Sequence, residues 1–578
     1  GIAGAVEIPI PEEWAHATEG GFIAKINRPD FVRNVCDVMN RQEGDDLPVS
    51  TFKGWEDGTF TTGTSHYERP AAAIQVPEWI PENCISCNQC AFVCPHAAIQ
   101  PFIVTEEEEA RAPEGFICRD LPGPKKGLKY RIIVSPEDCY GCSICANVCP
   151  APKKALVMKP IETQLDKQKY WDYAITLPRK ENPMNKFTVR GSQFEPTYFE
   201  FSGACAGCGE TPYVHLVTNL FGDRMLIANA TGCSSIYGAS APSMPYCTNA
   251  EGQGPAWANS LFEDNAEFGL GMHLGEIKLR RRVEEKLNEV LPSSDENTKT
   301  AIEEWLAGKD VGDGTRSRAE KLEAALNAKV SSHPEYKEIL ALKDHFIKKS
   351  QWIFGGDGWA YDIGFGGLDH VLASGEDINV LVLDTEVYSN TGGQSSKSTP
   401  AAAIAKFAAA GKKTKKKDLG MIAVSYGYIY VAQIALGADM NQAVKAIHEA
   451  ESYPGPSLII AYAPCINHGI KAGMGEASAE QKAAVECGYW CNWRYDPRLL
   501  DAGKNPFHLD SREPKGDFRK FLLGEVRYAS LQKLFPQEAE ALFEKTEKDA
   551  RARRQSYVRM QKSFDLEMQE HQAAAEQR

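Results

Sequence analysis

Two short cysteine runs, at residues 84–95 and 139–150, constrain this chain more than any other feature. They read CISCNQCAFVCP and CYGCSICANVCP, so each has the spacing C-x2-C-x2-C-x3-C-P. In bacterial [4Fe–4S] proteins with this spacing, the fourth cysteine of each run ligates the cluster of the other run. The runs therefore predict two clusters. Their expected ligands are Cys84, Cys87, Cys90 and Cys149 for the first, and Cys139, Cys142, Cys145 and Cys94 for the second.

Structural zinc is the main alternative for cysteines spaced in this way. Zinc sites use four cysteine or histidine ligands, but here eight cysteines repeat one pattern and only His96 lies close by. Disulfides fit less well, because they would cross-link neighbours within one loop. We therefore expect iron–sulfur clusters, and with them a reducing, cytoplasmic compartment.

The composition is that of an ordinary soluble protein. The chain has 578 residues, of which 43% are hydrophobic and 25% charged, so roughly two to four domains are expected. The net charge of −14 argues against nucleic acid as a partner. The most apolar stretch, residues 419–438, contains Ser425 and Gln433, which predicts a buried strand and helix and no membrane span.

The texture of the sequence changes near residue 200. Nearly continuous apolar runs then alternate with alanine-rich helical segments, which predicts a doubly wound parallel sheet. The runs are RMLIANATG (224–232), QWIFGGDG (351–358), INVLVLDTE (378–386) and SLIIAYAP (457–464). The expected divisions are a connecting region at 1–62, a two-cluster ferredoxin-like domain at 63–179, an α/β domain at 180–536 with a charged helical insertion at 275–350, and a C-terminal helical extension at 537–578.

Four further cysteines are placed to meet at one edge of that sheet. CAGC at 205–208 is a weak signal alone, because a redox pair, half a zinc site or coincidence would also explain it. Cys233 and Cys465, however, each follow a predicted strand. Ligands gather beyond the carboxyl ends of parallel strands, so a third cluster is possible. The remaining cysteines are expected to be ordinary buried thiols: Cys36, Cys118, Cys247, Cys487 and Cys491.

A glycine turn and a polar loop suggest a diphosphate site. In QWIFGGDGWAYDIG (351–364), Asp357 lies at the start of a predicted helix, where it would be a cap or a Mg²⁺ ligand beside phosphates. The next strand ends in LDTEVYSNTGGQSSKST (383–399). Such a pair of segments resembles the thiamine diphosphate fingerprint, with Thr385 and the Val387 carbonyl where paired asparagines are usual. The alternative is an ordinary loop between strand and helix.

The lysines of GKKTKKKD (411–418) form the densest basic run. They could attract an acidic partner or an anionic substrate, but a solvated loop is the expected interpretation.

Together these motifs resemble the C-terminal half of a single-chain pyruvate:ferredoxin (flavodoxin) oxidoreductase, a member of the 2-oxoacid:ferredoxin oxidoreductase family. The resemblance covers most of residues 20–500. Besides the cysteine runs, it is carried by DDLPVSTF, ERPAA, FSGACAGCGETPY, ATGCSS, GGDGWAYDIG, DTEVYSNTGGQSSKS and YAPCINHG. The implied fold is an α/β doubly wound thiamine-diphosphate-binding domain preceded by an α+β two-[4Fe–4S] ferredoxin-like domain.

The resemblance implies roles for individual residues. A third [4Fe–4S] cluster would be held by Cys205, Cys208, Cys233 and Cys465. Mg²⁺ would be held by Asp357, Thr385 and the carbonyl of Val387, and Asn390 would lie at the reacting carbon as the catalytic residue. The implied thiamine diphosphate contacts are Glu210, Cys233, Asp357, Gly358, Trp359, Ala360, Thr385, Glu386, Val387, Tyr388, Ser389 and Asn390.

The implied activity is oxidative decarboxylation of pyruvate to acetyl-coenzyme A and CO₂, with electrons passing one at a time to ferredoxin or flavodoxin. In this family an N-terminal half supplies the pyrimidine side of the cofactor site, the substrate-binding arginine and most coenzyme A contacts. Those parts do not occur in this chain, which begins at Gly1, so a partner chain or a longer polypeptide is expected, in a homo-oligomer. The alternatives are a polyferredoxin-type electron carrier, or an oxidoreductase for another 2-oxoacid.

Overall fold

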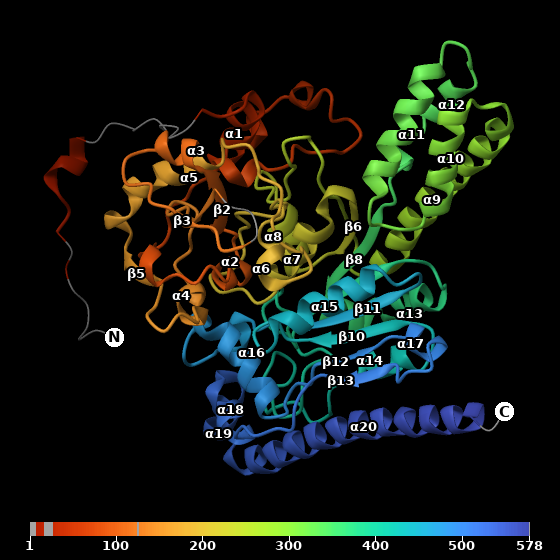
Figure 1. Cartoon of the computed structure of the whole chain (residues 1–578). Helices are drawn as coiled ribbons and strands as arrows, with labels where there is room; N and C mark the ends of the chain where they lie inside the picture. The colour runs from red at the N-terminus through yellow and green to blue at the C-terminus, as the bar shows by residue number, and fades with distance from the viewer. Residues whose placement is uncertain (1–6, 8, 17–26, 124–126, 577–578) are drawn as a thin grey trace.

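The computed structural model describes residues 7, 9–16, 27–123 and 127–576. It comprises a ferredoxin-like part, a larger α/β part and a projecting helical arm (Figure 1). The segment before the ferredoxin-like part is tied to the α/β part, because the Gly63 amide donates to the Tyr246 carbonyl over 2.8 Å. Short helical segments lie on either side of Gly63: Glu12–His16, Val32–Cys36, Asp37–Asn40 (α1), Gly44–Asp46 and Val49–Phe52 before it, and Thr64–Tyr67 after it.

The ferredoxin-like part holds two small antiparallel sheets around the cysteine runs. β1 (Gln75–Trp79) pairs with β5 (Leu156–Pro160), and a second sheet has the order β2-β4-β3. Each run enters a short helix, α2 (Gln89–Phe92) or α4 (Ile144–Val148), and these two helices are in contact. This is the expected α+β class. Its other elements are β2 (Ile99–Thr105), α3 (Glu106–Ala110), β3 (Arg119–Asp120), β4 (Leu128–Val134) and α5 (Gln168–Ala174).

An eight-stranded sheet forms the centre of the α/β part, in the order β13-β12-β10-β11-β9-β8-β6-β7. The six strands from β10 to β7 are parallel, whereas β12 and β13 are antiparallel additions at one edge. All four predicted strands are present and the fold class is confirmed. The strands are β6 (Met225–Ala230), β7 (Ala256–Ser260), β8 (Ser350–Gly356), β9 (Asn379–Asp384), β10 (Tyr430–Ile434), β11 (Ser457–Tyr462), β12 (Trp493–Tyr495) and β13 (Phe507–Leu509).

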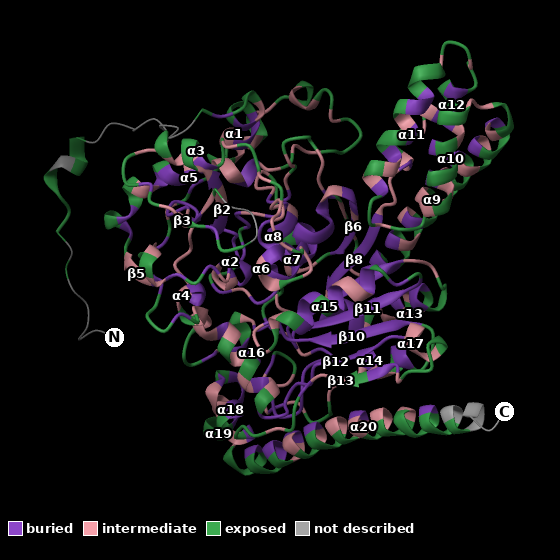
Figure 2. Cartoon of the chain, in the orientation of Figure 1, coloured by how far each residue is buried: buried purple, intermediate pink, exposed green. Residues whose placement is uncertain are grey.

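Both faces of this sheet are covered, which explains why its central strands are mostly apolar and buried (Figure 2). On β9, Val380 and Val382 point into one hydrophobic core, while Leu381 and Leu383 point into the other. Successive side chains of a strand face opposite ways, so the consecutive apolar residues Val380 to Leu383 fill both cores before the strand ends at Asp384. The covering helices include α6 (Val189–Ser192), α7 (Thr211–Phe221), α8 (Cys233–Ala239), α13 (Phe365–Ala373), α14 (Leu419–Val424) and α15 (Met440–Glu451).

The charged helical insertion is a separate arm with its own core. It contains α9 (Asn265–Val290), α10 (Glu296–Gly308), α11 (Thr315–Lys329) and α12 (Tyr336–Leu340), and it projects from the sheet in Figure 1. Its first helix begins at Asn265, ten residues before the expected start at 275. The early turns of α9 pack on the sheet, where Gly269 faces Ile353 and Ala228.

The C-terminal extension packs on the α/β part. Its helix α20 (Pro536–Glu576) buries Phe543 and Tyr557, and the Tyr557 hydroxyl donates to Asp418 over 2.9 Å. The helices before it are α16 (Ala477–Glu486), α17 (Arg498–Asp501), α18 (Phe518–Gly524) and α19 (Val526–Leu534).

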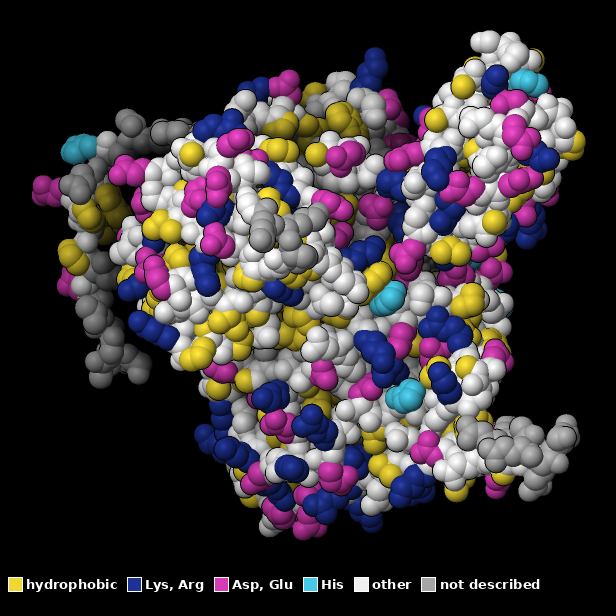
Figure 3. Space-filling model, in the orientation of Figure 1, with side chains coloured by type: hydrophobic (Ala, Val, Ile, Leu, Met, Phe, Trp, Pro, Cys, Tyr) yellow, Lys and Arg dark blue, Asp and Glu magenta, His cyan; other side chains and the backbone are white. Residues whose placement is uncertain are grey.

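The stretch 419–438 forms α14 and β10, as the sequence predicts. Within the described residues, no helix has the length and apolar character needed to cross a bilayer. Acidic and basic side chains are interspersed on the face seen in Figure 3.

Candidate cofactor and cluster sites

Both cysteine runs form tight loops built in the same way. The amide two residues after the first cysteine donates to that cysteine's sulfur, from Ser86 to Cys84 and from Gly141 to Cys139, each over 3.4 Å. Left-handed backbone at Ser86 (φ 56°) and Gly141 (φ 68°) accompanies these bonds. Hydrogen bonds to sulfur help set cluster reduction potentials, and the two loops share this one.

The first predicted group of four cysteines is brought together. Burial raises the pKa of the Cys90 thiol well above its usual range, and the nearby Cys87, Cys84 and Cys149 raise it further. The pKa of Cys87 is raised by burial and by Cys84 and Cys149. Cys149 therefore joins the other run's three cysteines, as the spacing predicts.

The second predicted group is assembled in the same manner. The pKa of the Cys145 thiol is raised well above its usual range, first by burial and then by Cys142, Cys139 and Cys94. Burial also raises the pKa of Cys94 to about 11, with a further contribution from Cys142. Cys90, from the first group, also raises the pKa of Cys145, so the two groups are neighbours.

The four remaining candidate ligands meet beyond the carboxyl ends of the large sheet. Cys205 and Cys208 lie in the loop before α7, Cys233 begins α8 after β6, and Cys465 follows β11. The pKa of Cys233 is raised by burial first, then by Glu210 and by the thiols of Cys208, Cys465 and Cys205. The structure thus gathers the set that the loops after separate strands only suggested.

The chemistry of these groups fits iron–sulfur clusters. Burial and neighbouring thiols raise the pKa of Cys90, Cys145 and Cys233, one in each group, so these thiols ionise when a cation offsets their charge. The irons of a cubane supply that charge.

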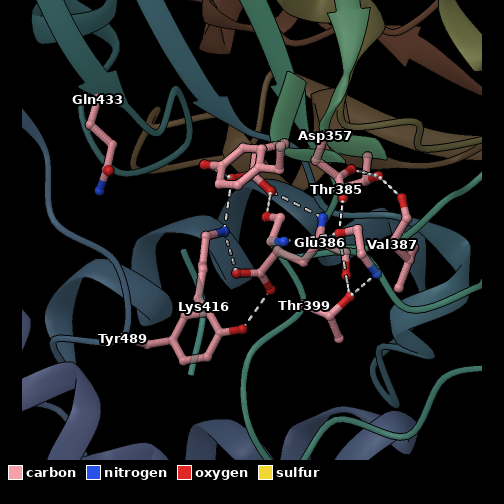
Figure 4. A network of polar contacts seen from close by, with 12 residues as sticks. Asp357, Thr385, Glu386, Val387, Thr399, Lys416, Gln433 and Tyr489 are labelled. Carbon is pink, nitrogen blue, oxygen red and sulfur yellow. Dashed lines mark hydrogen bonds and ion pairs between the residues drawn. The ribbon is translucent and has the colours of Figure 1, made fainter. Parts of the chain in front are cut away.

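The three candidate magnesium ligands converge at the ends of the adjacent strands β8 and β9. The Thr385 hydroxyl oxygen lies 3.0 Å from Asp357 Oδ1 and 3.1 Å from the Val387 carbonyl oxygen (Figure 4). One hydroxyl proton cannot serve both acceptors, so these oxygens have too few donors among themselves. Oxygens placed in this way suit a hard cation such as Mg²⁺.

Asp357 is the most constrained of these ligands. Its side chain is buried, and its pKa is raised well above the usual range by burial and by the Asp384 carboxylate. Ser396 donates to its Oδ2 over 2.5 Å. A bound cation would offset the charge that burial disfavours.

The other predicted cofactor contacts surround this point. Gly358 begins the helical turn after Asp357, and a Cβ there would lie 2.7 Å from the Tyr388 ring. Trp359 and Ala360 are buried in the core, Ser389 is half-buried, and Asn390 is exposed at the end of the loop. Glu210 is buried beside Cys233, and burial raises its pKa to about 7, against a hydrogen bond to Tyr237 that lowers it.

Glu386 differs from its neighbours in the loop. With left-handed backbone (φ 62°), its carboxylate accepts from Lys416 over 3.0 Å and from Arg527 over 2.8 Å. Lys416 also donates to Asp384 over 2.7 Å, and its side chain is only 9% exposed. The expectation of a solvated lysine loop is therefore wrong for Lys416, because this side chain neutralises two buried carboxylates.

Several residues of the site were missed by the sequence interpretation. Asp384 ends a strand directly before Thr385, which is a signal that could have drawn attention to it. Ser396, Lys416 and Arg527 come from segments without a recognisable motif. His468 follows Cys465 by three residues and contacts the Thr385 carbonyl at 2.7 Å.

Family models match three segments of the chain. Residues 83–153 match the 4Fe-4S dicluster domain, and residues 322–461 match the C-terminal TPP binding domain of thiamine pyrophosphate enzymes. Residues 23–71, most of them in the expected connecting region, match a domain of unknown function. These matches agree with the cluster groups and the diphosphate site described above.

Curated proteins similar to this chain match it over nearly its whole length. It is 58% identical to the pyruvate-flavodoxin oxidoreductase of Klebsiella pneumoniae over 97% of this chain and 48% of that protein. It is 54% identical to the pyruvate:ferredoxin oxidoreductase of Moorella thermoacetica over 96% and 48%. The value is 48% for the mitochondrial pyruvate dehydrogenase [NADP(+)] of Euglena gracilis, over 96% and 31%.

A solved 2-oxoglutarate:ferredoxin oxidoreductase from Magnetococcus marinus superposes with a TM-score of only 0.28 at 14% identity, covering 47% of this chain and 67% of that one. That likeness is too low to bear on the fold. The chain spans about half the length of the first curated relatives it matches. Its identity to them and its two matched domains show that the chain is similar, over nearly its whole length, to about half of the pyruvate-flavodoxin and pyruvate:ferredoxin oxidoreductases.

Proposed function

We propose that this chain supplies the cluster and diphosphate half of an enzyme that oxidises pyruvate to acetyl-coenzyme A and CO₂ and passes electrons through three [4Fe–4S] clusters to ferredoxin or flavodoxin. The rest of the protein, as a partner chain or as further polypeptide, would complete the cofactor site and bind coenzyme A. A cytoplasmic homo-oligomer is part of the proposal. The names of the relatives support pyruvate as substrate.

The observation that carries the proposal is a series of neighbouring groups that runs from the diphosphate loop to the ferredoxin-like part. Asn467, beside Cys465, donates through its side chain to the Ser389 carbonyl over 3.3 Å. The Gly207 amide, within the CAGC loop, contacts the Cys142 sulfur of the second group.

Beyond Cys142, the second group lies near the first, because Cys90 raises the pKa of Cys145. The first group reaches the surface at Ile85, which is 54% exposed. This order suits electron transfer outward, from the cofactor-proximal group to an external acceptor. A pure electron carrier would need neither the oxygen ligands at Asp357 nor the loop at Thr385.

The residues of this chain have separate tasks in the proposed reaction. Asp357, Thr385 and the Val387 carbonyl would hold Mg²⁺, and with it the diphosphate. Asn390, exposed at the end of the loop, is available to the substrate. Thiamine diphosphate, when bound, supplies the electron sink for decarboxylation.

The test uses the assembled protein, purified without oxygen. We expect it to retain thiamine diphosphate, Mg²⁺ and about twelve iron atoms, as three cubanes require. Pyruvate with coenzyme A should bleach the visible absorbance of the clusters, and a panel of other 2-oxoacids should do so less well. An assembled protein that retains no thiamine diphosphate would favour the electron-carrier alternative. Faster cluster reduction by another 2-oxoacid would make that acid, and not pyruvate, the proposed substrate.

A further inference from the structure

A buried histidine links the third cysteine group to the diphosphate loop. His468 lies three residues after Cys465 and is fully buried. Its Nε2 atom is 2.7 Å from the Thr385 carbonyl oxygen. Because a carbonyl oxygen only accepts hydrogen bonds, Nε2 carries a proton and donates it to this bond.

The other side of the ring faces a buried carboxylate. His468 Nδ1 lies 3.5 Å from Glu525 Oε1, at the junction of α18 and α19. Glu525 in turn accepts from Arg527 over 2.7 Å. Burial acts to raise the pKa of Glu525, but the charges of Arg527 and His468 lower it overall.

These contacts close into a ring, because Arg527 also pairs with Glu386, the residue next to Thr385. Each charged side chain of the ring is at most 1% exposed. Buried ionic groups are costly to displace once paired, so the ring holds the loop after β9 against the loop after β11. Within the described residues, the side chains of His468 and Asn467 both donate hydrogen bonds from the second loop to the first.

We infer that His468 is a positioning residue that holds the diphosphate loop at a fixed place relative to the cluster loop. The inference rests on the proposed function, because it concerns the same cofactor and cluster. Through its bond to the Thr385 carbonyl, His468 orients the peptide whose side chain is a candidate Mg²⁺ ligand. Without that bond, the Thr385 hydroxyl would lose its alignment with Asp357, and bound cofactor would lose its fixed separation from the cluster.

Two substitutions separate the roles of the two nitrogen atoms of the His468 imidazole. In His468→Gln, the amide nitrogen can occupy the place of Nε2 and still donate to the Thr385 carbonyl. In His468→Asn, the shorter amide occupies the place of Nδ1, so it keeps the contact with Glu525 and loses the bond to Thr385. His215→Gln is a matched control, because His215 is also a buried histidine but contacts Asn219 on its own helix.

The measurement is the thiamine diphosphate dissociation constant of the assembled protein at a fixed Mg²⁺ concentration, by equilibrium dialysis. Iron content and the low-temperature EPR spectrum of the reduced clusters are recorded in parallel. We expect His468→Asn to weaken binding at least about tenfold, by analogy with other second-layer metal-site residues, while His468→Gln and His215→Gln stay within about threefold of the wild type.

The outcomes separate the inference from the proposed function. If the wild type binds no thiamine diphosphate, the proposed function fails. If the wild type binds it and His468→Asn binds equally well, only the positioning role fails. An equal loss of thiamine diphosphate affinity in the glutamine and asparagine variants, with full iron content, would also overturn the inference. The size of the imidazole, and not its hydrogen bond to Thr385, would then be responsible.

Discussion

The Thr385 hydroxyl lies 3.0 Å from the Asp357 carboxylate, so the ends of two neighbouring parallel strands share one polar contact. Asp357 follows β8 and Thr385 follows β9, whose residues are paired in register as far as Gly356 and Leu383. The sheet therefore fixes the separation of the two side chains before any ligand binds. Such preorganisation lowers the cost of ordering a site on binding.

Removing the charge of Asp357 should abolish cofactor retention. Asp357→Asn keeps the shape of the side chain but lacks the anionic oxygen that Mg²⁺ prefers, so we expect thiamine diphosphate affinity to fall at least about a hundredfold. Equilibrium dialysis with and without Mg²⁺ measures this. Asp369→Asn, on α13 and bonded to Tyr426, is the matched control. Undiminished affinity in Asp357→Asn would remove this residue from the site.

The third cysteine group makes a prediction about iron content. In Cys233→Ser, one thiolate of the proximal group is lost, so we expect about eight iron atoms instead of about twelve, with the ferredoxin-like pair intact. Iron and acid-labile sulfide analysis measures this. Cys487→Ser alters a buried thiol bonded to the Ala484 carbonyl and should leave the count unchanged. A wild type with about eight irons would refute the third cluster.

Lys416 is expected to be a major determinant of stability. Lys416→Met leaves Asp384 and Glu386 without their shared cation, and breaking a buried ion pair costs about 3–5 kcal/mol. The measurement is denaturant unfolding of the α/β part. Lys445→Met, at an exposed lysine near Glu449 on α15, should change the free energy of unfolding by less than about 1 kcal/mol. Similar effects for both variants would contradict the proposed role of Lys416.

His215 predicts a loss of stability in mild acid. Burial lowers its pKa from 6.5 to about 4. Below about pH 6.5, His215 therefore binds a proton in the unfolded chain but stays neutral in the folded chain. The free energy of unfolding falls as the pH drops from about 6.5 towards 4. Between about pH 7.5 and about pH 5.5 the wild type should lose about 1.4 kcal/mol more than His215→Gln. Parallel unfolding curves of both proteins at the two pH values provide the test, and equal losses would exclude a neutral buried His215.

Short motifs allowed the cluster groups and the sheet to be predicted from sequence. Cys84, Cys87 and Cys90 are fixed by their spacing, and the strand ending at Asp384 by its continuous apolar pattern. Both signals are local, so they survive without knowledge of distant segments. Cys233 and Cys465 needed one further step, namely that parallel strands end at the same edge.

The charge network could not be predicted in this way. Lys416 lies in a run of lysines that resembles any solvated loop, and its partners Asp384 and Glu386 come from a distant segment. Arg527 and Glu525 come from the junction of α18 and α19, some 140 residues beyond the loop that they hold. The helical arm also begins earlier than expected, because the first turns of α9 cover the sheet, and charge content alone does not reveal this.

The short spacing between Cys465 and His468 has a consequence for damage by oxygen. An oxidised cluster releases its cysteines, and the loop that carried one of them would then be free to move. Because His468 in that same loop bonds to the Thr385 carbonyl, loss of the cluster should weaken the binding of thiamine diphosphate. Inactivation in air is therefore expected to release thiamine diphosphate and iron together. Replenishing iron alone would leave the protein inactive until the cofactor is also restored.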